Sequence, residues 1–167
     1  TGKLLEYVRS FGFSVRGVEL CPQSAAYARK KRTLKVYCGT LEDADFEPHS
    51  FGAVNFSHVI EHVPDPFLTM LEIKRVLAPG GVVMVTTPNI TGWQARLFGS
   101  KWRCYHRDHV FLFSKKTLKS LLKKAGFSIL ESFSWGGIEA GRTWIFIKKI
   151  ADKFAKRFDV GDVQFFL

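Results

Sequence analysis

Apolar residues recur along the chain at two spacings, which separate predicted helices from predicted strands. Apolar positions three or four residues apart are typical of one helical face and predict helices over residues 3–10, 22–32, 66–77, 114–125 and 144–158. Short runs of apolar and β-branched residues predict strands over residues 14–20, 34–38, 52–57, 82–87, 127–133 and 162–167. Because helices and strands alternate, the chain is expected to form an α/β fold on a parallel sheet.

The pattern loosens over residues 90–113, where aromatic and basic residues replace regular apolar spacing. On either side of this segment the helix boundaries are well marked. Pro79-Gly80-Gly81 is expected to end helix 66–77, while Ser114 is a suitable N-cap for the next helix and Gly126 ends it. Residues 90–113 therefore interrupt an otherwise regular alternation.

Composition narrows the class of protein. The 167 residues suit one domain, expected to span 1–167, and no apolar run is long enough to cross a membrane. The three cysteines, Cys21, Cys38 and Cys104, form no CxxC pair, which argues against a disulfide framework or a cysteine zinc site and favours a reducing, cytoplasmic location.

Charge is unevenly distributed along the chain. The formal net charge is +10, and residues 95–167 hold 15 Lys and Arg against 6 Asp and Glu. A basic surface of this kind suits nucleic acid, an anionic membrane or an acidic substrate, or is simply solvated. One interpretation is therefore a non-catalytic binding module. It would bind nucleic acid through the interleaved basic and aromatic residues of 96–107, or a membrane surface through the lysines of helix 144–158.

Two features predict a ligand at the carboxyl ends of the first strands. Glu19 lies 17 positions after Gly2, at the tip of strand 14–20. In nucleotide-binding α/β folds a glycine loop is followed about 20 residues later by a carboxylate that binds ribose hydroxyls. The loop of residues 39–43 follows the next strand, where Thr40 and the apolar Leu41 are suited to flank an adenine ring.

The most specific motif is Phe56-Ser57-His58-Val59-Ile60-Glu61-His62-Val63-Pro64-Asp65-Pro66, followed by Pro79-Gly80-Gly81. With Ala95-Arg96-Leu97, Trp102, His109, Phe113-Ser114, Thr117-Leu118 and Ala125-Gly126-Phe127, it resembles the class I S-adenosylmethionine-dependent methyltransferases. The resemblance is to the branch of ubiquinone-biosynthesis enzymes and of methyltransferase domain types 11, 12 and 23, and it covers nearly the whole chain.

This resemblance implies a Rossmann-like class I methyltransferase sheet, mostly parallel with an antiparallel C-terminal strand. It also implies S-adenosyl-L-methionine as cofactor and a small-molecule methyl acceptor, lipid-linked molecules included, on the side of residues 90–113 and 134–158. The cofactor-binding residues implied by the motif positions are Gly2, Glu19, Leu20, Thr40, Leu41, Glu42, Ser57 and His58.

The sequence departs from the family pattern at two places. The family's first strand and the opening of its glycine loop are expected before Thr1, and that strand lies at the centre of the family sheet. Thr40 stands where many members carry Asp, which weakens the predicted contact to the adenine amino group.

Methyl transfer needs a base only when the acceptor must lose a proton, because the cofactor is already activated. Imidazole titrates near neutral pH, so His62 and then His109 are the candidate catalytic residues. No metal is predicted, although His58, Glu61 and His62 approximate a divalent-cation site of some ubiquinone-branch enzymes.

Two other enzyme classes share part of these motifs. Residues 58–62 spell the H-x-x-E-H pattern of inverted zinc peptidases, which requires a helix, whereas Pro64 and Pro66 follow here. An NAD-linked dehydrogenase would share the Gly2–Glu19 spacing but would not explain the segments at 56–66 and 79–81.

Overall fold

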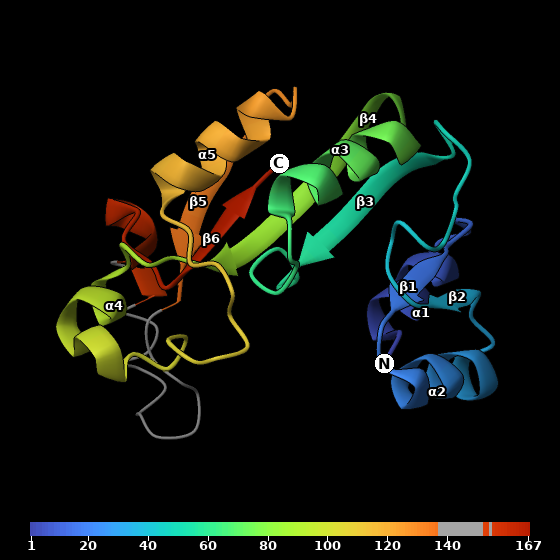
Figure 1. The fold of residues 1–167 in the computed structure, drawn as a ribbon, viewed down its shortest axis with the longest axis horizontal. Helices are drawn as coiled ribbons and strands as arrows, with labels where there is room; N and C mark the ends of the chain where they lie inside the picture. Colours follow the sequence, from blue (N-terminus) through green and yellow to red (C-terminus); the bar gives the residue numbers. More distant parts are fainter. Residues whose placement is uncertain (137–151, 154) are drawn as a thin grey trace. The chain divides into compact units, whose positions relative to one another are not determined.

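A computed structural model describes residues 1–136, 152, 153 and 155–167 (Figure 1). The chain forms two compact units, Thr1–Glu47 and Pro48–Leu167, which are taken in turn. Most of the predicted helix 144–158 lies outside the described residues. Of its described residues, 152, 153 and 155–158 are helical. Among the residues that the structure describes, no helix has the length and apolarity to cross a bilayer.

The first unit contains two helices and a two-stranded parallel sheet. Its elements are α1 (Lys3–Ser10), β1 (Gly17–Glu19), α2 (Pro22–Arg32) and β2 (Val36–Cys38). Strand β1 pairs with β2, with Gly17 opposite Val36 and Glu19 opposite Cys38. Both strands are shorter than predicted. Ala25 and Ala28 are buried against Leu34 and Val36, and their small side chains let α2 lie close to the sheet.

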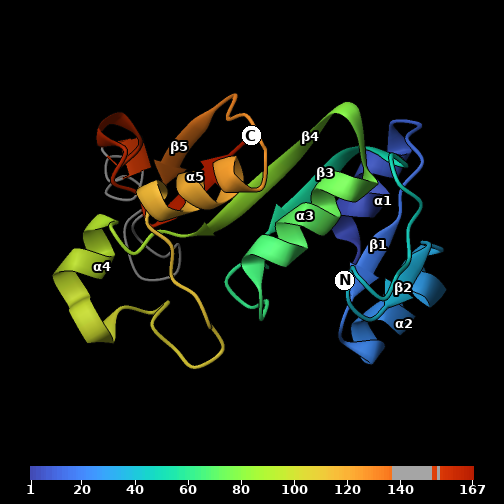
Figure 2. The same ribbon diagram turned by 45° about the horizontal axis from the view of Figure 1, so that its top comes forward.

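The second unit is built on a four-stranded mixed sheet (Figures 1 and 2). Its elements are β3 (Phe51–Ser57), α3 (Pro66–Val76), β4 (Leu77–Pro88), α4 (Trp93–Phe98), the 3-10 helix η1 (Gly99–Lys101), α5 (Lys115–Lys124), β5 (Ser132–Trp135) and β6 (Val163–Phe166). The strand order is β3-β4-β6-β5, β3 is parallel to β4, and β6 is antiparallel to both of its neighbours. The predicted α/β sheet with an antiparallel C-terminal strand is confirmed.

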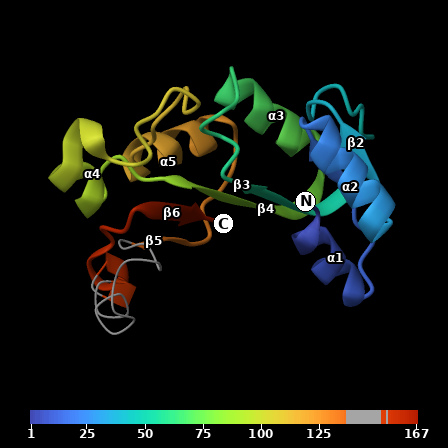
Figure 3. The ribbon, with the colours of Figure 1, turned by 90° about the horizontal axis from the view of Figure 1, so that it is seen from below.

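Helices α3 and α5 lie on the same face of this sheet (Figure 3). The side of α3 that carries Met70 and Ile73 is buried, as is the side of α5 that carries Leu118 and Leu122. Ser114 caps α5 as predicted, because its hydroxyl accepts the backbone N–H of Thr117 in a capping box. Helix spacing in the sequence therefore identified the two faces that cover the sheet.

The transition from α3 to β4 differs from the prediction. Pro79-Gly80-Gly81 was expected to end the helix, but α3 ends at Val76 and β4 already begins at Leu77, which lies opposite Phe51. The next pair is Ala53 with Val82, so the proline and glycines lie in an irregularity of the ladder. They interrupt the pairing rather than separate helix from strand.

Strand 127–133 was also predicted wrongly, since β5 begins only at Ser132. The backbone N–H of Phe127 donates to the Leu122 carbonyl and closes the C-terminal turn of α5. Gly126 makes that turn with a φ of 85°. The segment predicted to be irregular, 90–113, contains the short helices α4 and η1.

Candidate active site

The candidate site begins where β3 ends. The backbone N–H of His58 donates to the Thr86 carbonyl at 2.9 Å, continuing the β3–β4 pairing, and His58 then turns the chain with a φ of 52°. Further on, the Asp65 carboxylate accepts the N–H groups of Phe67 and Leu68 and starts α3. Residues 58–64 are consequently a tight turn at the carboxyl end of β3, where open α/β sheets bind ligands.

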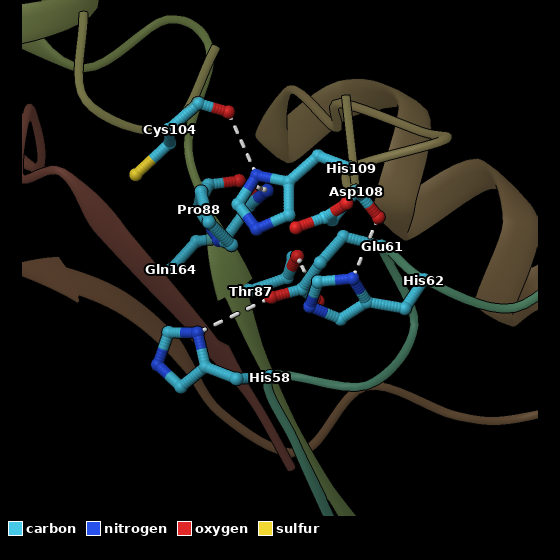
Figure 4. Close-up of polar contacts among 9 residues, drawn as sticks. All are labelled: His58, Glu61, His62, Thr87, Pro88, Cys104, Asp108, His109 and Gln164. Carbon is cyan, nitrogen blue, oxygen red and sulfur yellow. Dashed lines mark hydrogen bonds and ion pairs between the residues drawn. The ribbon is translucent and has the colours of Figure 1, made fainter. Parts of the chain in front are cut away.

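Glu61 is the buried centre of this turn, with 1% of its surface exposed. Its carboxylate accepts the Thr87 hydroxyl at 2.8 Å and lies 3.3 Å from Nδ1 of His58 (Figure 4). Burial by itself would raise the pKa of Glu61, but hydrogen bonds from His58, from its own backbone N–H and from Thr87 outweigh burial and hold that pKa below its ordinary value. Glu61 is therefore a charged carboxylate under the turn.

His62 and His109 both have their Nδ1 atoms bound to main-chain carbonyls. His62 Nδ1 lies 2.7 Å from the Asp108 oxygen, and His109 Nδ1 lies 2.7 Å from the Cys104 oxygen (Figure 4). A carbonyl only accepts, so each Nδ1 carries a proton, and the neutral ring has its lone pair on Nε2. The two rings meet edge to face, with centroids 4.8 Å apart. The structure thus presents two imidazoles with the tautomer that suits a base.

Residues 104–111 reach the turn through main-chain hydrogen bonds. The N–H of Phe111 donates to the Glu61 carbonyl at 3.1 Å, and the N–H of Ile90 donates to the Phe113 carbonyl at 3.0 Å. The buried Gln164 amide also donates to the Phe113 and Pro88 carbonyls. Segment 90–113 is therefore fixed at both the turn and the sheet, which brings together the two predicted catalytic histidines.

Glu61, His62 and His109 also form a group that could hold a metal ion. One ligand atom from each lies within 4.8 Å of the others. Carboxylate and imidazole ligands suit Zn²⁺ and related divalent ions. The sequence had suggested His58 with Glu61 and His62, whereas the geometry replaces His58 with His109. Residues 58–62 are not helical, so the arrangement that an inverted zinc peptidase requires is absent from this turn.

Two predicted cofactor residues, Ser57 and His58, lie in this unit, and Ser57 is the last residue of β3. Its hydroxyl donates to the Asn55 side chain at 2.8 Å. His58, predicted to bind cofactor beside it, has about half of its side chain exposed and holds Glu61. Ser57 and His58 therefore lie at the strand end as the motif implied.

The other predicted cofactor residues lie in the first unit. Glu19 ends β1, and its Oε1 accepts the N–H of Cys21 at 3.1 Å at the start of α2. Leu20 is largely exposed beside it. After β2, the Thr40 hydroxyl donates to the Asp43 carboxylate at 2.7 Å and accepts the Asp43 N–H at 3.1 Å. Leu41 and Glu42 lie within the turn that this exchange closes.

Gly2 fits the predicted glycine loop on physical grounds. Its φ is 76°, and a Cβ at this position would lie 2.6 Å from Cδ1 of Leu34 and 3.2 Å from the Ala28 methyl group. Only glycine adopts this conformation without strain and leaves this space. Glycine is therefore required here by the packing against Leu34 and Ala28, and the contacts of Gly2 and Glu19 with a cofactor stay predictions.

Comparison with known proteins identifies the class. A family model described as a methyltransferase domain matches residues 1–132. The chain therefore belongs to this family of class I S-adenosylmethionine-dependent methyltransferases, whose motif it carries around Glu61. The family's cofactor is S-adenosyl-L-methionine.

Curated relatives within that class are enzymes of several names. The chain is 34% identical over 100 residues to a ubiquinone biosynthesis O-methyltransferase of Idiomarina loihiensis, a match that covers 55% of this chain and 41% of the relative. It is 36% identical over 107 residues to a malonyl-[acyl-carrier protein] O-methyltransferase of Alcanivorax borkumensis, covering 64% of this chain and 36% of the relative. The matched part is less than half the length of either relative.

Solved structures share the fold. An S-adenosylmethionine-dependent methyltransferase from Mesorhizobium loti matches with a TM-score of 0.69 and 17% identity, covering 99% of this chain and 84% of the other. One from Archaeoglobus fulgidus matches with a TM-score of 0.68 and 15% identity, covering 99% and 80%. At these identities the likeness shows a Rossmann-like methyltransferase fold.

Four groups of the candidate site were not among the site residues predicted from the sequence. Glu61 and Thr87 form the buried pair beneath the histidines, and the Cys104 and Asp108 carbonyls fix the two imidazoles. Glu61 had a signal, since it lies within the H-x-x-E-H motif. No sequence signal identifies the two carbonyls, because every residue has a main-chain carbonyl.

Proposed function

We propose that the protein transfers the methyl group of S-adenosyl-L-methionine to a small-molecule acceptor that loses a proton in the reaction. The observation that carries this proposal is the pair of Nε2 lone pairs on His62 and His109, above the buried Glu61 carboxylate. Such a pair suits removal of a hydroxyl proton. Two relatives are named O-methyltransferases, which supports an oxygen acceptor.

When bound, the cofactor supplies a methyl group already activated by a sulfonium centre. The protein's own task is to orient the two reactants and to exclude water. We assign Gly2, Glu19, Leu20, Thr40, Leu41, Glu42, Ser57 and His58 to the cofactor. We assign the acceptor to the side formed by residues 90–113, the segment that contains His109. We also assign residues 134–158 to this side, although most of them lie outside the described residues.

In the reaction we propose, the acceptor hydroxyl gives its proton to Nε2 of His62 or His109. The oxygen would then be free to accept the methyl group that the cofactor would supply, and S-adenosylhomocysteine would be the product left behind. The Glu61 carboxylate stabilises the imidazolium that results, because it lies in the same group of atoms. We count lipid-linked molecules among the small acceptors that this site would take. We also propose that the enzyme acts in the cytoplasm.

The test is calorimetric titration of the full-length protein with S-adenosylhomocysteine. We expect a dissociation constant between about 1 µM and about 1 mM, the range typical of enzyme KM values. Glu19→Ala should weaken binding by at least about tenfold, because hydrogen bonds to a charged group are lost. Glu131→Gln, an exposed acidic position in the second unit, is the matched control. A wild-type protein that binds no S-adenosylhomocysteine at millimolar concentration would refute the proposal, and the binding-module interpretation would then stand.

A further inference from the structure

The turn that leads into β6 is hydrogen-bonded to the beginning of segment 90–113 and to Asn89 just before it. The Asn89 N–H donates to the Asp162 carbonyl at 2.7 Å, and the Asn89 side chain donates to the Gly161 carbonyl at 3.0 Å. The N–H of Trp93 donates to the Val160 carbonyl at 3.0 Å. A main-chain clamp thus joins residues about 70 positions apart and fixes where α4 starts.

The Asp162 side chain is buried within this clamp, with 0% of its surface exposed. The guanidinium of Arg103 lies 4.0 Å from its Oδ2. Burial raises the pKa of Asp162, while the indole N–H of Trp102, the charge of Arg103 and the backbone N–H of Gln94 act in the opposite direction. All three of these groups belong to segment 90–113, so the buried carboxylate faces that segment.

Trp102 and Arg103 directly precede the residue that holds His109. The indole of Trp102 is buried, and the chain then reaches Cys104, whose carbonyl accepts Nδ1–H of His109 at 2.7 Å. A shift of Arg103 moves this carbonyl, because Arg103 is bonded directly to Cys104. His62 takes its acceptor from Asp108, four residues further along.

We infer that Asp162 is a positioning residue for His109. Its carboxylate pairs with Arg103, and through this residue it places the next carbonyl, that of Cys104, which keeps the His109 proton on Nδ1 and the lone pair on Nε2. Its effect on methyl transfer rests on the proposed function, but its effect on the His109 ring does not. Asp162 is fully buried, so we assign it no contact with the acceptor.

The decisive measurement is the ¹⁵N spectrum of the histidine rings of the folded protein at a pH where they are neutral. In the wild type we expect His109 to show a protonated Nδ1 and an unprotonated Nε2. In Asp162→Asn we expect a mixture of both tautomers at His109, with the His62 ring unchanged. An unchanged His109 spectrum in folded Asp162→Asn overturns the inference.

Asp159→Asn is the matched control. Asp159 lies in the same turn, but its carboxylate accepts the Ser134 hydroxyl at 2.9 Å and pairs with Lys115. This variant should leave the His109 spectrum as in the wild type. If Asp162→Asn does not fold, Arg103→Gln takes its place, since this half-exposed side chain provides the charge that faces Asp162. A wild-type His109 spectrum in Arg103→Gln then overturns the inference.

Activity gives a second readout. Asp162→Asn should lower kcat by about tenfold to a hundredfold, as expected for a displaced catalytic group, and should change the affinity for S-adenosylhomocysteine less than twofold. An equal loss of cofactor affinity would indicate general unfolding and would contradict a positioning role. If the wild type transfers no methyl group, the proposed function fails, while the ring spectra still decide the role of Asp162.

Discussion

The hydroxyl of Thr87 donates a hydrogen bond of 2.8 Å to the Glu61 carboxylate, across 26 positions of sequence. Thr87 is 0% exposed and lies in β4, whereas Glu61 lies in the turn after the neighbouring strand β3. The bond therefore fastens the turn that carries His62 to the strand beside it. It also provides a hydrogen-bond donor to the charged Glu61 carboxylate, which is buried away from water.

Thr87→Val should lower the free energy of unfolding by about 1.5–3 kcal/mol, because it removes a hydrogen bond to a buried charged group at nearly constant volume. Urea denaturation followed by tryptophan fluorescence measures this loss. In a double-mutant cycle with Glu61→Gln, the two effects should not add. Additive losses would mean that the bond contributes no coupling between the two side chains.

Glu61 should make the protein less stable in acid. Its pKa in the folded protein is below the ordinary glutamate value of 4.5, so its stabilising effect is complete above that value and is lost as the pH falls through the lower, folded-state pKa. We expect the stability difference between wild type and Glu61→Gln to shrink as the pH is lowered from 6 toward about 3. A difference that stays constant over this range would contradict the assignment.

Asp162 should have the opposite pH dependence. Burial raises its pKa above the ordinary aspartate value of 3.8, so ionisation favours the unfolded chain as the pH rises from that value through the higher, folded-state pKa. Asp162→Asn should therefore gain stability relative to the wild type over this window. Thermal unfolding of both proteins at a series of pH values measures the trend, and a relative loss with rising pH would disprove it.

Replacing the proposed bases should slow methyl transfer without unfolding the protein. His62→Gln and His109→Gln are each expected to lower kcat by about 10²–10⁴, the usual contribution of a general base. His49→Gln is the control, because the Nδ1 atom of His49 also contacts a main-chain carbonyl, that of Leu77 at the other end of β4. Equal losses in all three variants would assign a structural role to these imidazoles.

Sequence reasoning was most successful where a local pattern determines the structure. The apolar face located α3, Ser114 located the start of α5, and the alternation of elements predicted the parallel pairs β1–β2 and β3–β4. It failed where hydrogen bonds depend on distant residues. The predicted strand 127–133 began too early, because the Phe127 N–H closes the end of α5 and β5 pairs with β6 only from Ser132, opposite Phe166.

The candidate site divides in the same way. Glu61 and His62 could be found because they follow a strand within one short motif, and His109 was found through resemblance. The partners of the two imidazoles could not be predicted, because the Asp108 carbonyl lies 46 positions from His62 and only the folded segment brings them together. The role of Thr87 required the β3–β4 register, which pairs Ser57 with Thr86.

Because the oxygens that hold His62 and His109 belong to the main chain, almost any amino acid at positions 104 and 108 provides them equally well. Side chains there are free to change shape, charge or polarity while both imidazoles keep their protons on Nδ1. Substitutions at positions 104 and 108 are therefore expected to leave the orientation of both imidazoles unchanged, so sequence variation at these positions carries no information about the histidines beside them.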